Sequence, residues 1–387
     1  MSEENENVVV NENAQEEHFG NANLRQANRA QEDEFYTQMS DLEKELNYYR
    51  LLFKDKVILC NCDDPYESNF FKYFAINFNF LGLKKLIATC FDGSPIAGEQ
   101  LSLFDFMEEN DVKQKRIAYK IEINEVKDFN EDGAVDLSDV NYLIKNNKNS
   151  LSKLKGNGDF RSAECIEFLK EADIVVTNPP FSLFREYVSQ LVEYKKDYII
   201  MGNTNALGYK NIFKLFKENK IRTWYTNFNV GMYFFVPEDT IKYHKIIDGK
   251  KAVRVATSCW FTSLPVRKHN DDLTLYKNYT PEKYPKYYNF DAINVNTYTD
   301  IPCDYNGYMG VPLTFLDKYN PSQFEIIGLG ISSSGLEIGV KGYTPEHKEY
   351  RKRVQKRGAV DGDLYLLDSD GHPQVPYTRI IIKKREQ

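Results

Sequence analysis

The chain has 387 residues, enough for one large domain or for a catalytic core with a smaller second part. No apolar run approaches the roughly 18 residues of a membrane-spanning helix, and the acidic amino terminus lacks the features of a secretion signal, so we expect a cytoplasmic protein without a membrane partner. Six scattered cysteines without a Cys-x-x-Cys pair, and only five histidines, argue against a disulfide framework or structural zinc.

The net charge of −7 is unfavourable for binding DNA phosphates, but it is unevenly distributed. Residues 1–34 hold nine acidic residues and two arginines, which account for all of it. Residues 1–24 contain few large apolar side chains, which predicts a disordered acidic tail. In the neutral remainder, the densest cationic run contains Arg351, Lys352, Arg353, Lys356 and Arg357. This run is consistent with a solvated helix face or with a phosphate-binding surface.

The first predicted elements after the tail open an α/β sheet. Aromatic and apolar residues recur at helical spacing over residues 28–53, which predicts an amphipathic helix. A buried strand at 57–60, a helix at 70–81 and a second strand at 85–90 then form a βαβ unit. The loop after the first strand lacks the glycine-rich dinucleotide fingerprint, so we expect a doubly wound sheet whose ligand has no pyrophosphate.

An alternating segment at 116–126 predicts a further strand, and the loop after it matches most positions of a calcium-binding loop. The predicted metal ligands are Asp128, Asn130, Asp132 and Asp139. A complete EF-hand needs a helix on each side, and the segment before this loop looks extended. The alternative is a solvated acidic turn that caps the helix beginning near Leu137.

An apolar run at 173–177 predicts a buried strand that must stop at Asn178, because Pro179 and Pro180 cannot extend it. The carboxyl ends of strands in open α/β sheets are where ligands bind. The amine of adenine is a poor nucleophile because its lone pair is delocalised into the ring. Two hydrogen-bond acceptors aimed at its two protons would oppose this delocalisation, and the side-chain oxygen of Asn178 and the carbonyl of Pro179 suit that task. Phe181 could stack on the base. The alternative is a simple strand-to-loop stop with Asn as a turn residue.

The Asn-Pro-Pro-Phe sequence resembles the catalytic motif of amino-methyltransferases that use S-adenosylmethionine. The wider sequence resembles the EcoRI-type adenine-specific DNA methyltransferase family, over segments at 33–37, 60–65, 158–162 and 309–315. This resemblance implies a Rossmann-like S-adenosylmethionine-dependent methyltransferase sheet with a smaller C-terminal α+β region. It also implies methyl transfer to N6 of an adenine that is flipped out of duplex DNA, with Asn178, Pro179, Pro180 and Phe181 as the catalytic residues.

The resemblance further implies a set of cofactor-binding residues. Those expected to contact S-adenosylmethionine are Phe35, Tyr36, Thr37, Asp63, Asp64, Asp92, Asp159 and Phe160. The aromatic motif would lie near the methionine end, Asp63 or Asp64 would take the ammonium, Asp92 the ribose hydroxyls, and Asp159 the adenine amine. There are three alternatives. The aromatic motif could only dock a helix, Asp63 and Asp64 could form a helix N-cap, and Asp159 could be a turn residue.

We therefore expect a methyltransferase domain at 25–264 and a target-recognition region at 265–387, where the composition shifts toward Tyr, Asn, Lys and Pro. The expected partners are double-stranded DNA, bound through the cationic run at 351–357, and a cognate restriction endonuclease, with the protein itself a monomer. Two rival functions stay open. One is methylation of RNA or of a protein glutamine by the same fold, and the other is non-catalytic DNA binding.

Overall fold

The computed structural model describes residues 9–10, 36–62, 68–91, 118–131, 133–146, 151–226, 231–236, 243–247 and 249–386. The chain divides into two compact units. Unit 1 comprises Met1–Asn203 and Trp224–Leu264, and unit 2 comprises Thr204–Thr223 and Pro265–Gln387. No helix of the described residues is long and apolar enough to cross a membrane.

Within unit 1, the strands of a mixed sheet follow the order β6-β5-β4-β3-β7-β8-β13. The strands are β3 (Val57–Asn61), β4 (Lys85–Thr89), β5 (Tyr119–Ile123), β6 (Leu151–Lys153), β7 (Ile174–Thr177), β8 (Asp197–Asn203) and β13 (Ser258–Thr262). The central strands β4, β3, β7 and β8 run parallel, and the strands outside them pair antiparallel. Every residue of β3 and β7 is buried, as expected for strands covered on both faces.

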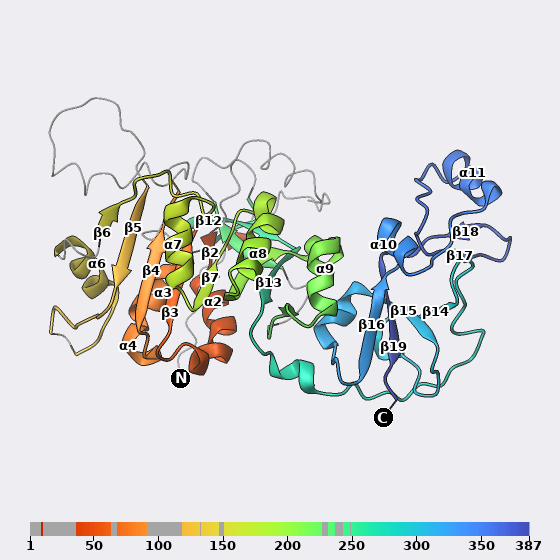
Figure 1. Cartoon of the computed structure of the whole chain (residues 1–387), viewed down its shortest axis with the longest axis horizontal. Helices are drawn as coiled ribbons and strands as arrows, with labels where there is room; N and C mark the ends of the chain where they lie inside the picture. Colours follow the sequence, from red (N-terminus) through yellow and green to blue (C-terminus); the bar gives the residue numbers. More distant parts are fainter. Residues whose placement is uncertain are drawn as a thin grey trace. The chain divides into compact units, whose positions relative to one another are not determined.

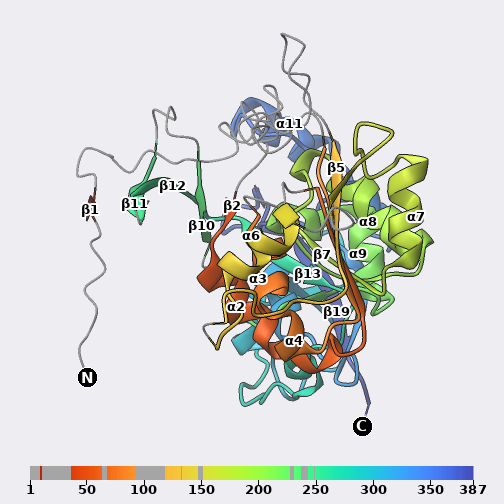
Figure 2. The ribbon, with the colours of Figure 1, turned by 90° about the vertical axis from the view of Figure 1, so that its left-hand side faces the viewer.

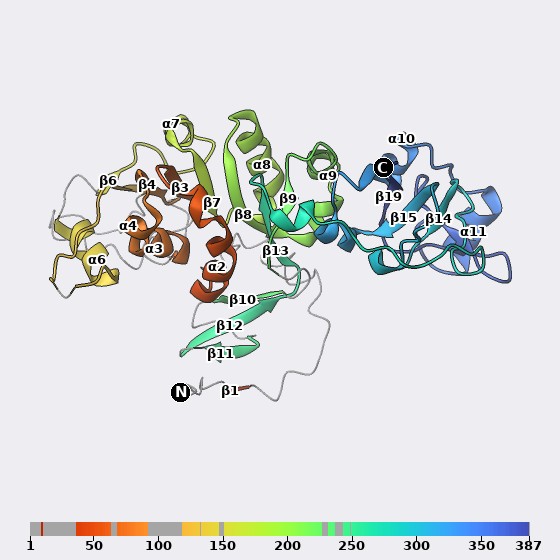
Figure 3. The same cartoon turned by 90° about the horizontal axis from the view of Figure 1, so that it is seen from below.

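Helices cover both faces of this sheet, with α7 and α8 on one face and α2, α3 and α4 on the other (Figure 3). Their bounds are α2 (Met39–Leu46), α3 (Asn69–Ile76), α4 (Phe78–Leu81), α6 (Leu137–Asn146), α7 (Ala163–Glu171) and α8 (Phe184–Glu193), with 3₁₀ turns η1 (Asn47–Leu52) and η2 (Phe181–Leu183). This α/β arrangement of parallel strands and covering helices is the fold class predicted from the sequence.

A second, antiparallel sheet of unit 1 has the order β1-β11-β12-β10-β2 (Figure 2). Its strands are β1 (Val9–Val10), β2 (Tyr36–Thr37), β10 (Met232–Phe235), β11 (Lys245–Ile247) and β12 (Lys250–Val255). The prediction of a helix over residues 28–53 is wrong at Tyr36 and Thr37, because they pair with β10, and tertiary strand pairing overrides the local helical period. Strand β1 lies within the segment expected to be disordered, the rest of which is outside the described residues.

Unit 2 is an α+β structure around the four-stranded sheet β14-β15-β19-β16 (Figure 1). Its strands are β9 (Arg222–Thr223), β14 (Ala292–Asn294), β15 (Tyr308–Pro312), β16 (Phe324–Leu329), β17 (Leu366–Leu367), β18 (Pro373–Gln374) and β19 (Arg379–Lys384). Its helices are α9 (Lys210–Lys217), α10 (Ser332–Glu337) and α11 (Pro345–Arg353), with η3 (Thr204–Gly208), η4 (Arg267–Asn270), η5 (Tyr298–Asp300) and η6 (Leu313–Lys318).

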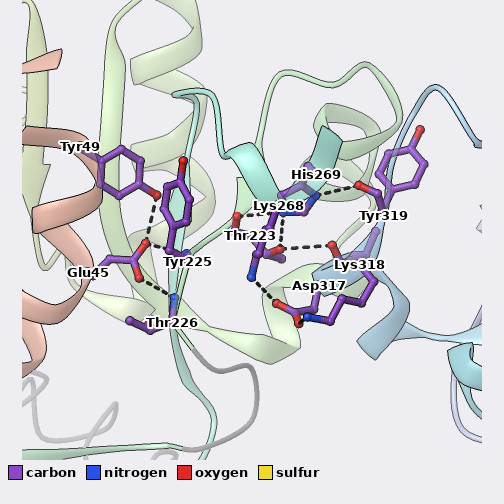
Figure 4. Close-up of polar contacts among 11 residues, drawn as sticks. Glu45, Tyr49, Thr223, Tyr225, Thr226, Lys268, His269, Asp317, Lys318 and Tyr319 are labelled. Carbon is purple, nitrogen blue, oxygen red and sulfur yellow. Dashed lines mark hydrogen bonds and ion pairs between the residues drawn. The ribbon is translucent and has the colours of Figure 1, made fainter. Parts of the chain in front are cut away.

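Thr204–Thr223 belongs to unit 2, although the sequence analysis placed it in the catalytic domain. Two contacts explain this. The ammonium of Lys217 in α9 donates to the carbonyl of Ile327 in β16, at 2.8 Å. The buried ring of His269 lies with Nδ1 2.8 Å from the Tyr319 carbonyl oxygen and Nε2 3.2 Å from the Thr223 carbonyl oxygen (Figure 4). These bonds tie residues 204–223 to the rest of unit 2.

Candidate active site

The Asn-Pro-Pro-Phe segment lies at the carboxyl end of β7. The strand ends at Thr177, and the following Asn178 is only 7% exposed. Pro179 is buried, Phe181 is half-buried, and the 3₁₀ turn η2 begins at Phe181. Proline explains the stop, because it has no N–H to continue the ladder. A buried amide therefore stands where ligands bind in parallel α/β sheets.

The neighbouring strand β3 fixes this segment from the side. Strands β3 and β7 are parallel, and Ile58 and Leu59 pair with Ile174 and Val175. Beyond these pairs, the Thr177 hydroxyl donates a hydrogen bond to the backbone carbonyl of Asn61. Each partner is buried. The residue before Asn178 is thus held by the last residue of β3.

A tyrosine of α8 completes this contact. The hydroxyl of Tyr187 donates to the side-chain oxygen Oδ1 of Asn61. Burial raises the pKa of Tyr187 well above its ordinary value, so the hydroxyl keeps its proton and stays a donor. Asn61, Thr177 and Tyr187 form one buried network at the sheet edge. Sequence reasoning missed it, because nothing in a lone Asn or a helical Tyr indicates that they meet.

The turn that contains Gly158, Asp159 and Phe160 packs against the same edge. Gly158 has φ +78°, and a Cβ added there would lie 2.0 Å from the carbonyl oxygen of Cys90, the residue after β4. Only glycine permits that approach. Phe160 is 6% exposed, and its ring meets that of Tyr187 edge-on with centroids 5.0 Å apart. The structure therefore brings this turn together with the ends of β3, β4 and β7.

Asp159 is engaged by Arg161. The guanidinium donates from Nε to Oδ1 at 2.9 Å and from Nη2 to Oδ2 at 2.7 Å, and the Arg161 backbone N–H also donates to Oδ1 at 2.8 Å. These bonds lower the pKa of Asp159, which stays ionised. A carboxylate offers about four acceptor positions, so Oδ2 retains one for a further donor.

The Phe35-Tyr36-Thr37 motif is only partly described, since Phe35 and the side chain of Tyr36 lie outside the described residues. Thr37 is 3% exposed, and its carbonyl accepts from Nδ2 of Asn69, the first residue of α3, at 2.8 Å. Its hydroxyl has no hydrogen-bond partner among the described residues. A buried hydroxyl of this kind is a candidate ligand contact, because leaving it unpaired costs about 1–3 kcal/mol.

The aspartates Asp63, Asp64 and Asp92 also lie outside the described residues. The chain before the first two is informative. Cys62 follows β3 with φ +85°, a left-handed conformation that is strained for a residue with a Cβ. Such strain clusters at ligand sites. In the sequence, Asp63 comes directly after Cys62, and Asp92 comes shortly after the last residue of β4.

The loop from Asp128 to Asp139 does not support a calcium site. Oxygens of Asp139 accept from the backbone N–H groups of Phe129 at 2.7 Å and Asp136 at 3.0 Å, and Asp128 accepts from the N–H of Gly133 at 2.8 Å. These bonds lower the pKa of Asp139. The element before the loop is β5, not a helix. The geometry fits the alternative of an acidic turn before α6; Asn130 donates to Ser138, and Asp132 lies outside the described residues.

A buried carboxylate that sequence reasoning also missed supports the second sheet of unit 1. Glu45 of α2 is fully buried, and it accepts from the Tyr49 hydroxyl at 3.0 Å and from the N–H groups of Tyr225 and Thr226 at 2.8 and 2.9 Å (Figure 4). Burial raises its pKa. Glu45 thereby anchors the segment that leads toward β10, the strand that pairs with Thr37.

The cationic run lies in unit 2, at the end of α11. Lys352, Lys356 and Arg357 are exposed. Arg353 is also exposed and pairs with Glu349 at 3.0 Å. Arg351 differs, because its guanidinium donates to the Gln355 side chain and to the Gly358 carbonyl at 2.6 and 3.2 Å. Arg351 therefore shapes the turn after the helix.

The sheet and the buried Asn-Pro-Pro-Phe edge define the class of S-adenosylmethionine-dependent amino-methyltransferases. The model of the family described as adenine-specific methyltransferase EcoRI matches residues 23–385. The chain belongs to this family.

Individual relatives agree with the family match. The chain is 43% identical to the type II methyltransferase M.EcoRI of Escherichia coli over 349 residues, which cover 86% of this chain and 97% of that protein. It is 38% identical over 313 residues to M.MgeORF184P of Mycoplasma genitalium and to M.MpnI of Mycoplasma pneumoniae, covering 79% of this chain and 85% and 84% of those proteins. No solved structure matches the chain significantly.

Proposed function

We propose that this adenine-specific methyltransferase acts on N6 of an adenine flipped out of duplex DNA, at one short recognition sequence. Membership of the family supports DNA adenine methylation and the use of S-adenosylmethionine. The observation that carries the proposed site is the burial of Asn178 at the carboxyl end of β7, held by the network of Asn61, Thr177 and Tyr187. This network gives the preorganisation that catalysis by positioning needs.

Residues of this edge, together with Thr37 of β2, fit S-adenosylmethionine, which supplies an electrophilic methyl group on a positively charged sulfur when it is bound. Thr37 offers a buried hydroxyl without a partner among the described residues. Asp159 keeps one acceptor position for an amine, beside the buried ring of Phe160. Asp63, Asp64 and Asp92 follow β3 and β4, and carboxylates suit an ammonium group and ribose hydroxyls.

The chemistry that we assign to Asn178 and Pro179 is orientation of the target amine. Their oxygens accept hydrogen bonds from its two protons, which draws the nitrogen lone pair out of conjugation with the ring and directs it at the methyl donor. They also stabilise the positive charge that develops on the nitrogen before a proton leaves. Phe181 stacks on the base and holds its plane.

Unit 2 is the proposed target-recognition region, and its cations at the end of α11 are the proposed phosphate contacts. Unit 2 includes all of the expected recognition region at 265–387. The described residues of unit 1, apart from β1, all fall within the expected catalytic domain at 25–264. We further propose that the protein is a cytoplasmic monomer with a cognate restriction endonuclease as its biological partner.

The experiment that tests the function measures transfer of labelled methyl from S-adenosylmethionine to unmethylated duplex DNA, followed by nucleoside analysis. We expect N6-methyladenine from the wild type. Asn178→Ala should lower the rate by about 100-fold or more, because a preorganised acceptor is lost. Asn178→Asp keeps the acceptor oxygens and serves as the conservative variant. Cofactor binding, measured by calorimetry, should stay within about threefold of wild type in both.

Three results would contradict the proposal or part of it. Transfer to tRNA, rRNA or a protein glutamine without transfer to duplex DNA would assign the fold to a different acceptor. Cofactor binding without transfer to any of these acceptors would indicate a non-catalytic protein. Equal rates for Asn178→Ala and wild type would remove the acceptor role from Asn178 while leaving the family activity intact.

A further inference from the structure

The most exposed of the large apolar and aromatic side chains in the described residues is Tyr377. It is 93% exposed and lies in the short connection between β18 and β19. Most tyrosines of unit 2 are packed far more deeply, and Tyr284 and Tyr287 are 2% and 4% exposed. Leaving an aromatic ring in water forgoes the stabilisation that burial brings, so a ring presented in this way suits a contact with another molecule.

The backbone of Tyr377 accepts a hydrogen bond from a buried side chain, whereas its ring is exposed. Its carbonyl accepts from Nη1 of Arg379 at 3.2 Å, and Nε of Arg379 donates to Oδ1 of Asn294 at 3.2 Å. Arg379 is 8% exposed and begins β19, which pairs on both sides in the four-stranded sheet. The Tyr287 hydroxyl donates to the same Asn294 oxygen at 2.7 Å. An exposed ring with an anchored backbone loses little entropy on binding.

The residues beside Tyr377 in the chain give its ring no exposed apolar neighbour. The flanking Val375, Pro376 and Thr378 are half-buried, and the exposed Gln374 lies three residues before Tyr377. The guanidinium of Arg379 is buried and donates to an amide and a carbonyl oxygen, so no bonded carboxylate offsets its charge in the described part of unit 2. A partner protein that docks through apolar contacts would need a contiguous apolar patch. A polyanion whose bases can stack fits this combination better.

The cationic end of α11 contacts the start of β18, the strand that precedes Tyr377. Nε2 of Gln355 donates to the Pro373 carbonyl at 2.9 Å, and the ring of Tyr350 stacks on His372 with centroids 4.0 Å apart and planes 9° apart. Pro373 begins β18, which leads into the connection that carries Tyr377. Figure 1 shows α11 beside β17 and β18. The exposed ring and the exposed cations thus belong to neighbouring segments of unit 2, joined through Gln355 and Tyr350.

We propose that Tyr377 inserts its ring at a base step of the duplex DNA bound by unit 2 and stacks on a base that this insertion separates from its neighbour, while Lys352, Lys356 and Arg357 contact phosphates of the same duplex. This inference rests on the proposed function and adds a contact that is neither ionic nor part of the catalytic edge. Base stacking is tolerant of sequence, so the contact contributes affinity and not the identity of the recognition site.

The test uses the full-length protein and a duplex that holds its own recognition sequence, read from the methylated positions in DNA of a host that expresses the wild type. Dissociation constants come from fluorescence anisotropy at four salt concentrations. Tyr377→Ala should bind about tenfold more weakly or worse. Tyr377→Phe should bind within about twofold of wild type. The slope of log Kd against log salt should be unchanged in both, because no cation is removed.

A matched control is Tyr276→Ala, which removes another exposed ring of unit 2, 67% exposed, and should bind within about twofold of wild type. All variants should keep the wild-type melting temperature and affinity for S-adenosylmethionine. Wild-type affinity in Tyr377→Ala, or an equal loss in Tyr377→Phe, would overturn the stacking role. A wild type that methylates no DNA would instead overturn the proposed function on which the inference rests.

Discussion

The proposed catalytic edge of unit 1, at the carboxyl ends of β3 and β7, and the cationic end of α11 in unit 2 are built in opposite ways. At the proposed catalytic edge, Asn61, Thr177 and Tyr187 are buried and bonded to one another. At the end of α11, Lys352, Lys356 and Arg357 are exposed to solvent. The first arrangement fixes side-chain positions through burial and hydrogen bonds, whereas the second supplies charge that need not be placed so finely.

This difference predicts how each region responds to single substitutions. Buried groups that share partners lose packing and leave neighbours unpaired, so each substitution at the edge should be costly. Exposed cations act through a summed, salt-dependent attraction, so each one should matter little by itself. Three substitutions, taken from the largest expected effect to the smallest, test this contrast.

Gly158→Ala should have the largest effect. The new methyl group would lie 2.0 Å from the carbonyl oxygen of Cys90, and the backbone has φ +78°. We expect the turn to be displaced from β4, with a loss of about 3–5 kcal/mol in the free energy of unfolding and loss of cofactor binding. Denaturant unfolding and calorimetric titration with S-adenosylmethionine measure the two effects.

The control lies two residues away in the same turn. Gly156 has nothing within 4 Å of an added Cβ and does not have a left-handed φ. Gly156→Ala should therefore leave stability within about 0.5 kcal/mol of wild type and should not weaken cofactor binding. Similar losses in the two variants would show that the close approach to Cys90 is not what the turn requires.

The parts of this edge that sequence could predict are those governed by local rules. A strand must stop before Pro179 and Pro180, so the position of Asn178 follows from the chain alone. The pairing of Asn61 with Thr177 joins residues 116 positions apart, and that of Asn61 with Tyr187 joins residues 126 apart. Neither residue type marks such contacts, so only the folded sheet shows them.

Local sequence patterns also predict the wrong secondary structure where pairing with a distant strand determines it. The three- and four-residue spacing around Tyr36 and Thr37 is helical, yet both residues form β2 because β10 offers them hydrogen-bond partners. The calcium-loop pattern at 128–139 likewise describes a sequence of acidic residues, but their oxygens accept bonds from the loop's own N–H groups. A sequence pattern reports composition and residue spacing, whereas the hydrogen-bond partners of a residue depend on the topology of the fold.

Tyr187→Phe should have an intermediate effect. It removes the donor to Oδ1 of Asn61 and leaves a buried acceptor unpaired, without changing the ring that packs on Phe160. We expect a loss of about 1–3 kcal/mol in the free energy of unfolding and a several-fold lower methyl-transfer rate, because Asn178 lies next to the loosened Thr177. The half-buried Tyr194, which caps the end of α8, gives the control Tyr194→Phe. Wild-type stability and rate in Tyr187→Phe would show that the network does not position the site.

Lys356→Ala should have the smallest effect, and it tests the contrast from the side of unit 2. The side chain is exposed, so we expect stability to change by less than about 0.5 kcal/mol. If Lys356 contacts a phosphate, DNA affinity should fall a few-fold, and the slope of log Kd against log salt should decrease by about one. Lys286→Ala is the matched control, because its ammonium pairs with Asp291 at 2.9 Å and its charge is already offset. An unchanged slope in Lys356→Ala would remove this residue from the phosphate contacts. A loss of several kcal/mol in the free energy of unfolding would show that the end of α11, like the edge of β3 and β7, is held by contacts that depend on one another. The contrast between the two regions would then fail.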